Sequence, residues 1–387
     1  MDELLLIPGP TQVPPQVREA TARQMINHRG PRFTALYQEV QQDLRPLFGS
    51  GGEDILIFPS SGTGVMESAV ANLFSPGDRV LATVMGEFGE RFAAIAEAYG
   101  LQVDRLRVPA GAALTAEEIA GHLDREGPGR YRGVLVTHNE TSTGVLLDLP
   151  AVARAVKERG LLLAVDAVSS VGGVEVRCAD WGVDVLVTAS QKALMTPPGL
   201  GLVYVAPAAW EAVERARLPR YYWDYRRARQ AQAKGQTPYT PAVSLWYGLR
   251  AALAALHREG LAQVFLRHRR MAGAFRAGAR ALGLELLADD EVASPLVTAV
   301  RAPAGRDAGE IIRALREDEG VVVAGGQGEL KGRIFRVAHM GAATPEQMVR
   351  ALAALGRVLR RLGLADDPEA GAEAARRVLE EAAVSGR

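Results

Sequence analysis

Two charged side chains and one polar turn follow apolar runs of the sequence, and together they could do chemistry. Asp166 ends one apolar run, and Lys192 follows the next one along the chain. Ser61-Gly62-Thr63 follows an earlier run and precedes a stretch with helical spacing. Because α/β sheets build their sites at the carboxyl ends of their strands, we expect the three features to lie at one edge.

The turn at Ser61 suits a phosphate group, because a helix N-terminus offers free N–H groups and a favourable dipole. Taken alone, an ordinary capped turn explains it equally well. Asp166 and Lys192 could likewise be a structural ion pair, since a buried acid needs a cationic partner. Together, the three features fit pyridoxal phosphate better. Lys192 would form a Schiff base with the aldehyde, and Asp166 would pair with the protonated pyridine nitrogen.

Other chemical motifs are absent from the sequence. Gly62 and Gly64 are followed by Glu67 where a dinucleotide-binding fingerprint needs a third glycine. The P-loop, His-Glu-x-x-His and Gly-x-Ser-x-Gly motifs do not occur, and the six histidines lack the spacing of metal ligands. The single cysteine, Cys178, excludes an internal disulfide and a multi-thiolate zinc site. We therefore predict no metal centre.

Composition narrows the class of protein further. The chain has 48% hydrophobic and 23% charged residues, as folded proteins have. Its 45 basic and 45 acidic side chains cancel, so we expect no nucleic-acid partner, and the aromatic and basic stretch 221–227 is interpreted as a packed loop. Acidic residues follow Met1, and no apolar stretch reaches about 20 residues, so we expect no signal peptide, no membrane span and a cytoplasmic location.

Between residues 50 and 205, short apolar runs alternate with stretches of helical spacing, which predicts an α/β fold with a mostly parallel sheet. Because several runs are apolar throughout, helices should cover both faces of the sheet. Strands are predicted over 55–58, 80–84, 102–108, 133–138, 161–166, 184–189 and 201–205. Helices are predicted over 65–74, 88–99, 115–123, where Thr115 and Glu118 form a capping box, and 149–159.

The second half of the chain has a different pattern. Residues 215–242 predict an irregular connection, and long helices should follow over 243–282. A smaller α/β set comes next, with strands near 295–301, 321–324 and 333–337 and helices near 309–319 and 344–362. The tail has no strong apolar face, so we expect a solvated or frayed helix. We divide the chain into four parts. Residues 1–20 are an N-terminal segment that packs with the small domain, and residues 21–265 form the large domain. Residues 266–364 form the small domain, and residues 365–387 are the tail.

Several segments stand in a characteristic order: Ser61-Gly62-Thr63, Asn139-Glu140-Thr141-Ser142-Thr143-Gly144, Val165-Asp166-Ala167-Val168-Ser169-Ser170, Ser190-Gln191-Lys192 and Phe335-Arg336-Val337-Ala338-His339-Met340-Gly341. Together they resemble class V aminotransferases, which have fold type I. The likeness runs from Pro8-Gly9-Pro10-Thr11 to about residue 362. It implies a large three-layer α/β domain, which would bind pyridoxal 5′-phosphate, and a smaller C-terminal α/β domain.

The resemblance assigns roles to the residues at matching positions. Lys192 would hold the cofactor and move a proton as general acid and base, and Asp166 would pair with the pyridinium. The phosphate would be held by Ser61, Gly62, Thr63 and Gln191.

Four further positions complete the implied site. Phe88 would stack on the cofactor ring, although a core aromatic at a helix start is an alternative. Thr141 would offer its hydroxyl to the ring. Arg336 would bind the substrate carboxylate; its alternative is a structural ion pair with an acid of the large domain. Thr240 would reach in from a second subunit, which implies a homodimer with composite sites.

The resemblance is closest to aminotransferases that move an amino group from alanine, serine or aspartate to glyoxylate or pyruvate. A cysteine desulfurase or lyase of the same fold is the nearest alternative, but it needs a nucleophilic cysteine on a mobile loop, and Cys178 lies before a predicted strand. A non-catalytic cofactor-binding subunit is the alternative from another class. Lys192 and Arg336 argue against it, because both would serve turnover.

Overall fold

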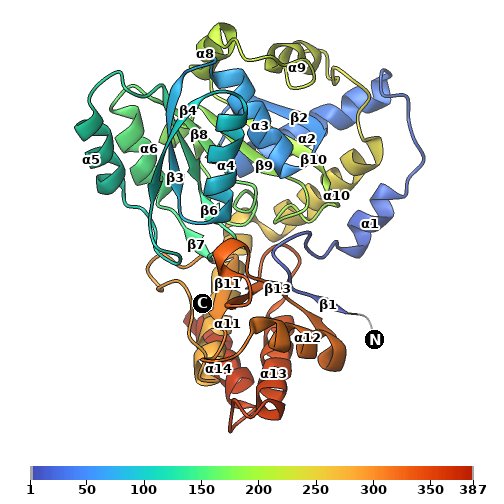
Figure 1. Ribbon diagram of the computed structural model, residues 1–387. Coiled ribbons are helices and arrows are strands. Elements are labelled where there is room, and N and C mark those ends of the chain that lie inside the picture. Colours follow the sequence, from blue (N-terminus) through green and yellow to red (C-terminus); the bar gives the residue numbers. More distant parts are fainter. Residues whose placement is uncertain (1–2, 386–387) are drawn as a thin grey trace.

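The computed structural model describes residues 3–385, and a seven-stranded sheet forms the centre of their larger part (Figure 1). All strands run parallel except β10, which is antiparallel to both neighbours. Each predicted strand of this sheet is present with ends within two residues of those expected. In spatial order the strands are β2 (Asp54–Ser60), β10 (Gly199–Val205), β9 (Val185–Ala189), β8 (Leu162–Asp166), β5 (Gly133–Thr137), β3 (Arg79–Val84) and β4 (Gln102–Arg107).

Helices cover both faces of this sheet, because alternate side chains of its strands enter two different apolar cores. In β2, Ile55 and Ile57 enter one core, while Leu56 and Phe58 enter the other. The first core is closed by α2 (Pro31–Phe48), α5 (Ala116–Glu126), α6 (Leu149–Lys157) and α10 (Val243–Glu259). The second is closed by α3 (Gly62–Leu73), α4 (Glu87–Ala98) and α8 (Ala209–Arg215). The predicted three-layer α/β architecture is confirmed.

Local sequence signals set several helix ends. Thr115 and Glu118 form both bonds of the predicted capping box: Glu118 N donates to Thr115 Oγ1 at 3.2 Å, and Thr115 N donates to Glu118 Oε2 at 2.8 Å. The short helix α7 (Cys178–Trp181) ends at Gly182, whose left-handed backbone closes it.

A second, three-stranded sheet lies below the first in Figure 1, with its own apolar core. It is formed by β11 (Val297–Arg301), β14 (Ile334–Ala338) and β13 (Ala324–Gly325), with α11 (Leu261–Ala281), α12 (Ala308–Glu319) and α13 (Pro345–Arg361). The N-terminal strand β1 (Leu4–Leu5) pairs with β12 (Val321–Val322), whereas α1 (Pro15–Thr21) packs on α10. The proposed boundary at residue 265 falls inside α11 and stays a prediction.

The tail forms a helix, as expected, but this helix is packed against the small domain rather than solvated or frayed. Helix α14 (Ala370–Ser385) packs against α11 and α13, and Ala372 and Ala375 are fully buried. Gly278 permits this approach, since a Cβ there would lie 2.6 Å from the carbonyl oxygen of Gly371. The apolar face is made largely of alanines, which is why the sequence pattern did not stand out. Residues 386–387 of the predicted tail lie outside the described residues.

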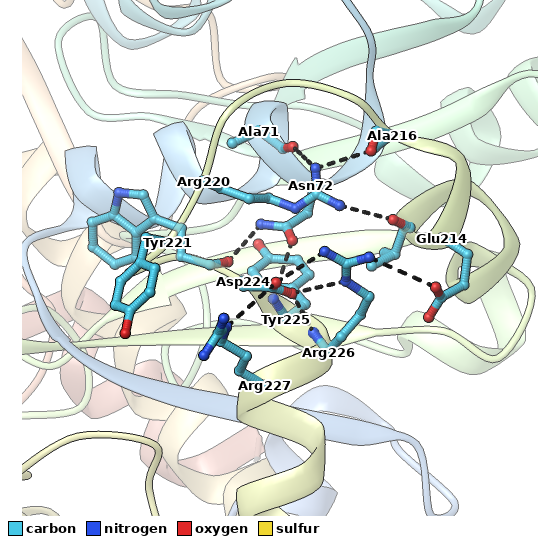
Figure 2. A network of polar contacts seen from close by, with 12 residues as sticks. Ala71, Asn72, Glu214, Ala216, Arg220, Tyr221, Asp224, Tyr225, Arg226 and Arg227 are labelled. Carbon is cyan, nitrogen blue, oxygen red and sulfur yellow. Dashed lines mark hydrogen bonds and ion pairs between the residues drawn. The ribbon is translucent and has the colours of Figure 1, made fainter.

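The connection predicted as irregular contains a helix, α9 (Tyr225–Gln232), capped by Asp224. Asp224 also pairs with Arg226 at 3.0 Å, and Arg220 donates to the carbonyl oxygen of Ala71 at 3.1 Å (Figure 2). Asn72 of α3 fixes both sides of the turn, donating to Trp223 O at 2.7 Å and accepting from Tyr225 N at 3.1 Å. The connection is therefore fastened to α3, the helix that begins at Ser61.

Candidate active site

Asp166 and Lys192 lie at the carboxyl edge of the central sheet. Asp166 ends β8, and Lys192 comes three residues after the neighbouring strand β9. Both side chains are largely buried, yet they do not form the structural ion pair that the sequence left open. Burial raises the pKa of Asp166 to about 7, although its carboxylate accepts a 2.9 Å hydrogen bond from Val168 N. Within residues 3–385, no cation lies within ion-pair distance of it.

The N-terminal segment covers Lys192. Its Nζ donates to the Pro8 carbonyl oxygen at 2.5 Å, and Thr11 Oγ1 donates to the Lys192 carbonyl oxygen at 2.8 Å. Gly9 has a φ of +133°, a backbone conformation that favours glycine, and a Cβ there would also lie 2.5 Å from Nζ. Burial lowers the pKa of Lys192 to about 8, and the charge of Arg336 adds to this effect. Sequence reasoning noted Pro8-Gly9-Pro10-Thr11 but missed this contact.

The turn at Ser61 lies beside the segment that follows Asp166. Ser61 caps α3 by accepting from Gly64 N at 3.2 Å, and the first-turn N–H groups of a helix have no intrahelical acceptors. A Cβ on Gly62 would lie 2.9 Å from Val168, so the turn and that segment are in close contact. Thr63 is the next residue of the same turn.

Gln191 precedes Lys192 in this cluster. Its side-chain oxygen is buried and has no hydrogen-bond partner among the residues that the structure describes. A buried amide oxygen without a partner loses the hydrogen bonds that it made with water. The unpaired oxygen of Gln191 therefore indicates that a bound polar group completes this position. The predicted role of Gln191 in holding a phosphate stays a prediction.

Thr141 lies in a polar network just beyond β5. Its hydroxyl donates to Ser169 Oγ at 2.8 Å, and Asn139 Nδ2 donates to the same oxygen at 2.8 Å. All three side chains are buried. The network joins the segment after β5 to the segment after β8, so it fixes Thr141 relative to Asp166.

Arg336 comes from β14 of the second sheet and reaches the segment that holds Thr141. Its Nε donates to Gly325 O at 2.9 Å and its Nη1 to Thr141 O at 3.0 Å. The structural ion pair left open as an alternative is not found: in the described part of the chain no carboxylate lies within ion-pair distance of Arg336. Burial lowers the pKa of Arg336 to about 10. A guanidinium has five N–H donors, and only two of those of Arg336 are used by these backbone carbonyls, so donors remain for another group.

Phe88 lies in the first turn of α4 and is half-buried, unlike the side chains that make up the apolar cores. The Arg91 guanidinium lies 4.7 Å from the centre of its ring. The charge of Arg91 lowers the pKa of both Asp166 and Lys192, although burial has the larger effect on each. Sequence reasoning missed Arg91, because an arginine inside a helix carries no signal by itself.

Thr240 lies apart from these residues in one chain. It is exposed and belongs to a turn in which Thr237 Oγ1 donates to Tyr239 O at 2.7 Å. Tyr239 donates to Tyr221 O at 3.1 Å, so the turn is held against the 216–224 connection. The predicted contribution of Thr240 to a partner's site stays a prediction.

The described residues hold neither a membrane-spanning helix nor a cluster of metal-binding side chains. None of their helices is long and apolar enough to cross a membrane. No group of three or more His, Cys, Asp or Glu side chains among residues 3–385 could hold a metal ion.

The family model described as "Aminotransferase class-V" matches residues 4–351. This chain belongs to the class-V aminotransferases. Proteins of this family depend in general on pyridoxal phosphate. The predicted family and fold type are both confirmed.

Individual relatives show how wide the family is. The chain is 42% identical to the small subunit of a soluble hydrogenase from Synechococcus sp. (strain PCC 6716), over 97% of this chain and 98% of that protein. It is 39% identical to an L-aspartate–glyoxylate aminotransferase from Paracoccus denitrificans, over 93% and 92%. A pyridoxamine-pyruvate aminotransferase from Mesorhizobium loti superposes with a TM-score of 0.93 at 32% identity, covering 98% of both chains.

Proposed function

We propose that this protein is a pyridoxal-phosphate-dependent aminotransferase that moves an amino group from a small amino acid to glyoxylate or pyruvate. Alanine, serine and aspartate are the proposed donors. The observation that carries the proposal is the edge of the central sheet, where Asp166 is buried and Lys192 largely buried without an ion pair between them. Charges kept apart in this way leave room for a group that pairs with both.

The residues at the edge fit pyridoxal phosphate. Bound there, the cofactor takes an amino group from one substrate and gives it to the next. Asp166 would face the pyridine nitrogen, Phe88 would stack on the ring and Thr141 would offer it a hydroxyl. The phosphate would be held by Ser61, Gly62, Thr63 and Gln191, whose amide oxygen has no partner within the described residues.

Lys192 would attach the cofactor and then carry the proton that leaves and rejoins the substrate's α-carbon. Its pKa, lowered to about 8, suits that work, because a group with a pKa near the working pH exchanges protons most readily. Burial keeps water from competing for the same proton.

Arg336 would bind the α-carboxylate that every amino-acid and oxo-acid substrate shares. Two backbone carbonyls fix its guanidinium, so its remaining N–H donors are held in place rather than ordered on binding. A carboxylate can then be bound by two parallel hydrogen bonds.

The active unit would be a homodimer, with Thr240 of each protomer completing the phosphate site of the other. Its exposure in one chain supports this assignment. We further propose a cytoplasmic location, since the sequence has one cysteine and so no internal disulfide.

The alternatives are weaker. Cys178 is fully buried in the large core, and burial raises the pKa of its thiol, so it lacks the accessible thiolate that a cysteine desulfurase needs. A single cysteine also cannot supply the four thiolates of an iron–sulfur cluster, which speaks against a redox centre of the kind that a hydrogenase subunit would suggest.

The test is a half-reaction experiment on the full chain loaded with pyridoxal phosphate. We expect alanine, serine or aspartate to discharge the visible absorbance, and pyruvate or glyoxylate to restore it. A chain that binds the cofactor but responds to no amino acid would instead be a non-catalytic subunit.

A further inference from the structure

Glu140 is a buried carboxylate for which the proposed function has no use. It lies in the short strand β6 (Asn139–Glu140) and is fully buried. No Lys, Arg or His of residues 3–385 lies within ion-pair distance of it. Burial raises its pKa, and hydrogen bonds oppose that rise. A buried charge is costly, so its hydrogen bonds must account for its place here.

Those hydrogen bonds all come from two short segments. Phe88 N and Gly89 N each donate to Oε2 at 3.1 Å, while Ser142 donates to Oε1 through N at 3.1 Å and through Oγ at 2.5 Å. Ser142 Oγ also accepts from Glu87 N at 3.0 Å. Three successive N–H groups at the start of α4 are therefore held by one carboxylate and one hydroxyl.

Gly86, which precedes α4, is in close contact with the side chains of Ser142 and Glu140. A Cβ on Gly86 would lie 2.3 Å from Ser142 Oγ and 2.7 Å from the carboxyl carbon of Glu140. The negative charge also suits the positive end of the α4 dipole. The backbone from which the Phe88 side chain projects is thus fixed by Glu140.

Glu140 is linked to the substrate end of the site as well. The next residue, Thr141, accepts the 3.0 Å hydrogen bond from Arg336 Nη1. The charge of Glu140 raises the pKa of both Arg336 and Asp166, although burial has the largest effect on each. One two-residue segment therefore connects the aromatic side of the site with the arginine.

We propose that Glu140 is a positioning residue, whose buried carboxylate anchors the first turn of α4 and so holds the Phe88 ring against bound pyridoxal phosphate. This inference rests on the proposed function, because it needs the cofactor to bind beside Phe88. In this role Glu140 would not touch the cofactor or the substrate. It acts through the N–H groups of residues 88 and 89.

The test is a double-mutant cycle on cofactor affinity, measured by titrating the cofactor-stripped full chain with pyridoxal phosphate. Phe88→Ala should weaken binding by about tenfold, as expected for loss of one aromatic contact. Glu140→Gln keeps the shape of the side chain but places an NH2 group against backbone N–H donors that need an acceptor. It should weaken cofactor binding nearly as much as Phe88→Ala does. In the Phe88→Ala background the same change should cost no more than about twofold, since contacts that act through one another are not additive.

Glu97→Gln is the matched control, because Glu97 lies on the same helix but pairs with Arg105 at the surface. It should leave the affinity unchanged. Ser142→Ala is a second variant in case Glu140→Gln does not fold, and it should act in the same direction through the same turn. Equal losses from Glu140→Gln in both backgrounds, or no loss in either, would overturn the positioning role. A chain that binds the cofactor but transfers no amino group would overturn the proposed function alone, and one that binds no cofactor would overturn both.

Discussion

Each of the two edges of the central sheet holds a buried aspartate, but only one of these aspartates has a lysine partner. At the amino edge, Asp184 is 2% exposed and contacts Lys157 Nζ at 2.5 Å, and it also accepts from Leu163 N at 2.7 Å. At the carboxyl edge, Asp166 is 3% exposed and accepts a single hydrogen bond, from Val168 N. Its nearest lysine along the sheet, Lys192, bonds to Pro8 instead.

We infer from this difference that Asp184 is a structural acid, whereas Asp166 is the acid to which we propose a functional role. A satisfied ion pair such as Asp184 with Lys157 needs no further group. A buried acid without a cation raises the free energy of the folded chain, and it is retained where a ligand completes it.

The largest effect is expected from Lys192→Ala. Loss of the group that carries the proton should lower turnover by on the order of a thousandfold or more. A steady-state transamination assay measures this. Lys157→Ala, at the other edge, is the control and should retain activity in the folded chain. Equal activity of the Lys192→Ala protein and the wild type would remove Lys192 from the reaction.

Asp166→Asn should stabilise the cofactor-free chain at neutral pH. The pKa of Asp166 is about 7 in the folded chain, above its value in the unfolded chain. Between about pH 4 and 7 the folded wild type therefore binds more protons than the unfolded chain does. Its free energy of unfolding falls as the pH rises through this range. The variant lacks this loss, so at pH 8 it should be more stable by on the order of 3 kcal/mol. Urea unfolding at pH 4 and pH 8 tests the sign; an equal difference at both values would contradict it.

Arg336→Lys should weaken the binding of every substrate alike. Lysine cannot offer two parallel donors to a carboxylate, so kcat/KM should fall by an amount equivalent to about 2 kcal/mol for amino and oxo acids. The visible spectrum of the bound cofactor should not change. Unchanged kcat/KM in both half-reactions would leave the substrate carboxylate without an assigned partner.

The smallest effect is expected from Asp184→Asn, and it has the opposite sign to that of Asp166→Asn. Removing the charge weakens the contact with Lys157, which is partly exposed, so the free energy of unfolding should fall by about 1 to 2 kcal/mol. Turnover should not change. A stabilised Asp184→Asn protein would erase the contrast between the two edges.

The sequence predicted the strands and the edge site well because both depend on local patterns. Apolar runs mark buried strands, and the strand ends place Asp166 and Lys192 without further information. It missed the packing of α14, whose buried face is made largely of alanines, and it missed the helix α9, which is short and is held by Asn72 from another helix.

The contacts that complete the site could not be predicted, because they join distant parts of the chain. Pro8 reaches Lys192 across 184 positions, and Thr141 reaches Arg336 across 195. In the sequence Glu140 is only one residue of the segment 139–144, and nothing there indicates its hydrogen bonds to α4. Tertiary packing determines such contacts, and the spacing of apolar residues in the sequence carries no information about them.

The central claim is tested most directly by finding which lysine attaches pyridoxal phosphate. The chain has only four lysines: Lys157, Lys192, Lys234 and Lys331. The full-length protein is mixed with the cofactor, reduced with borohydride, digested and mapped by mass spectrometry. We expect a modification on Lys192 in near-stoichiometric amount. Attachment to another lysine, or to none, would contradict it.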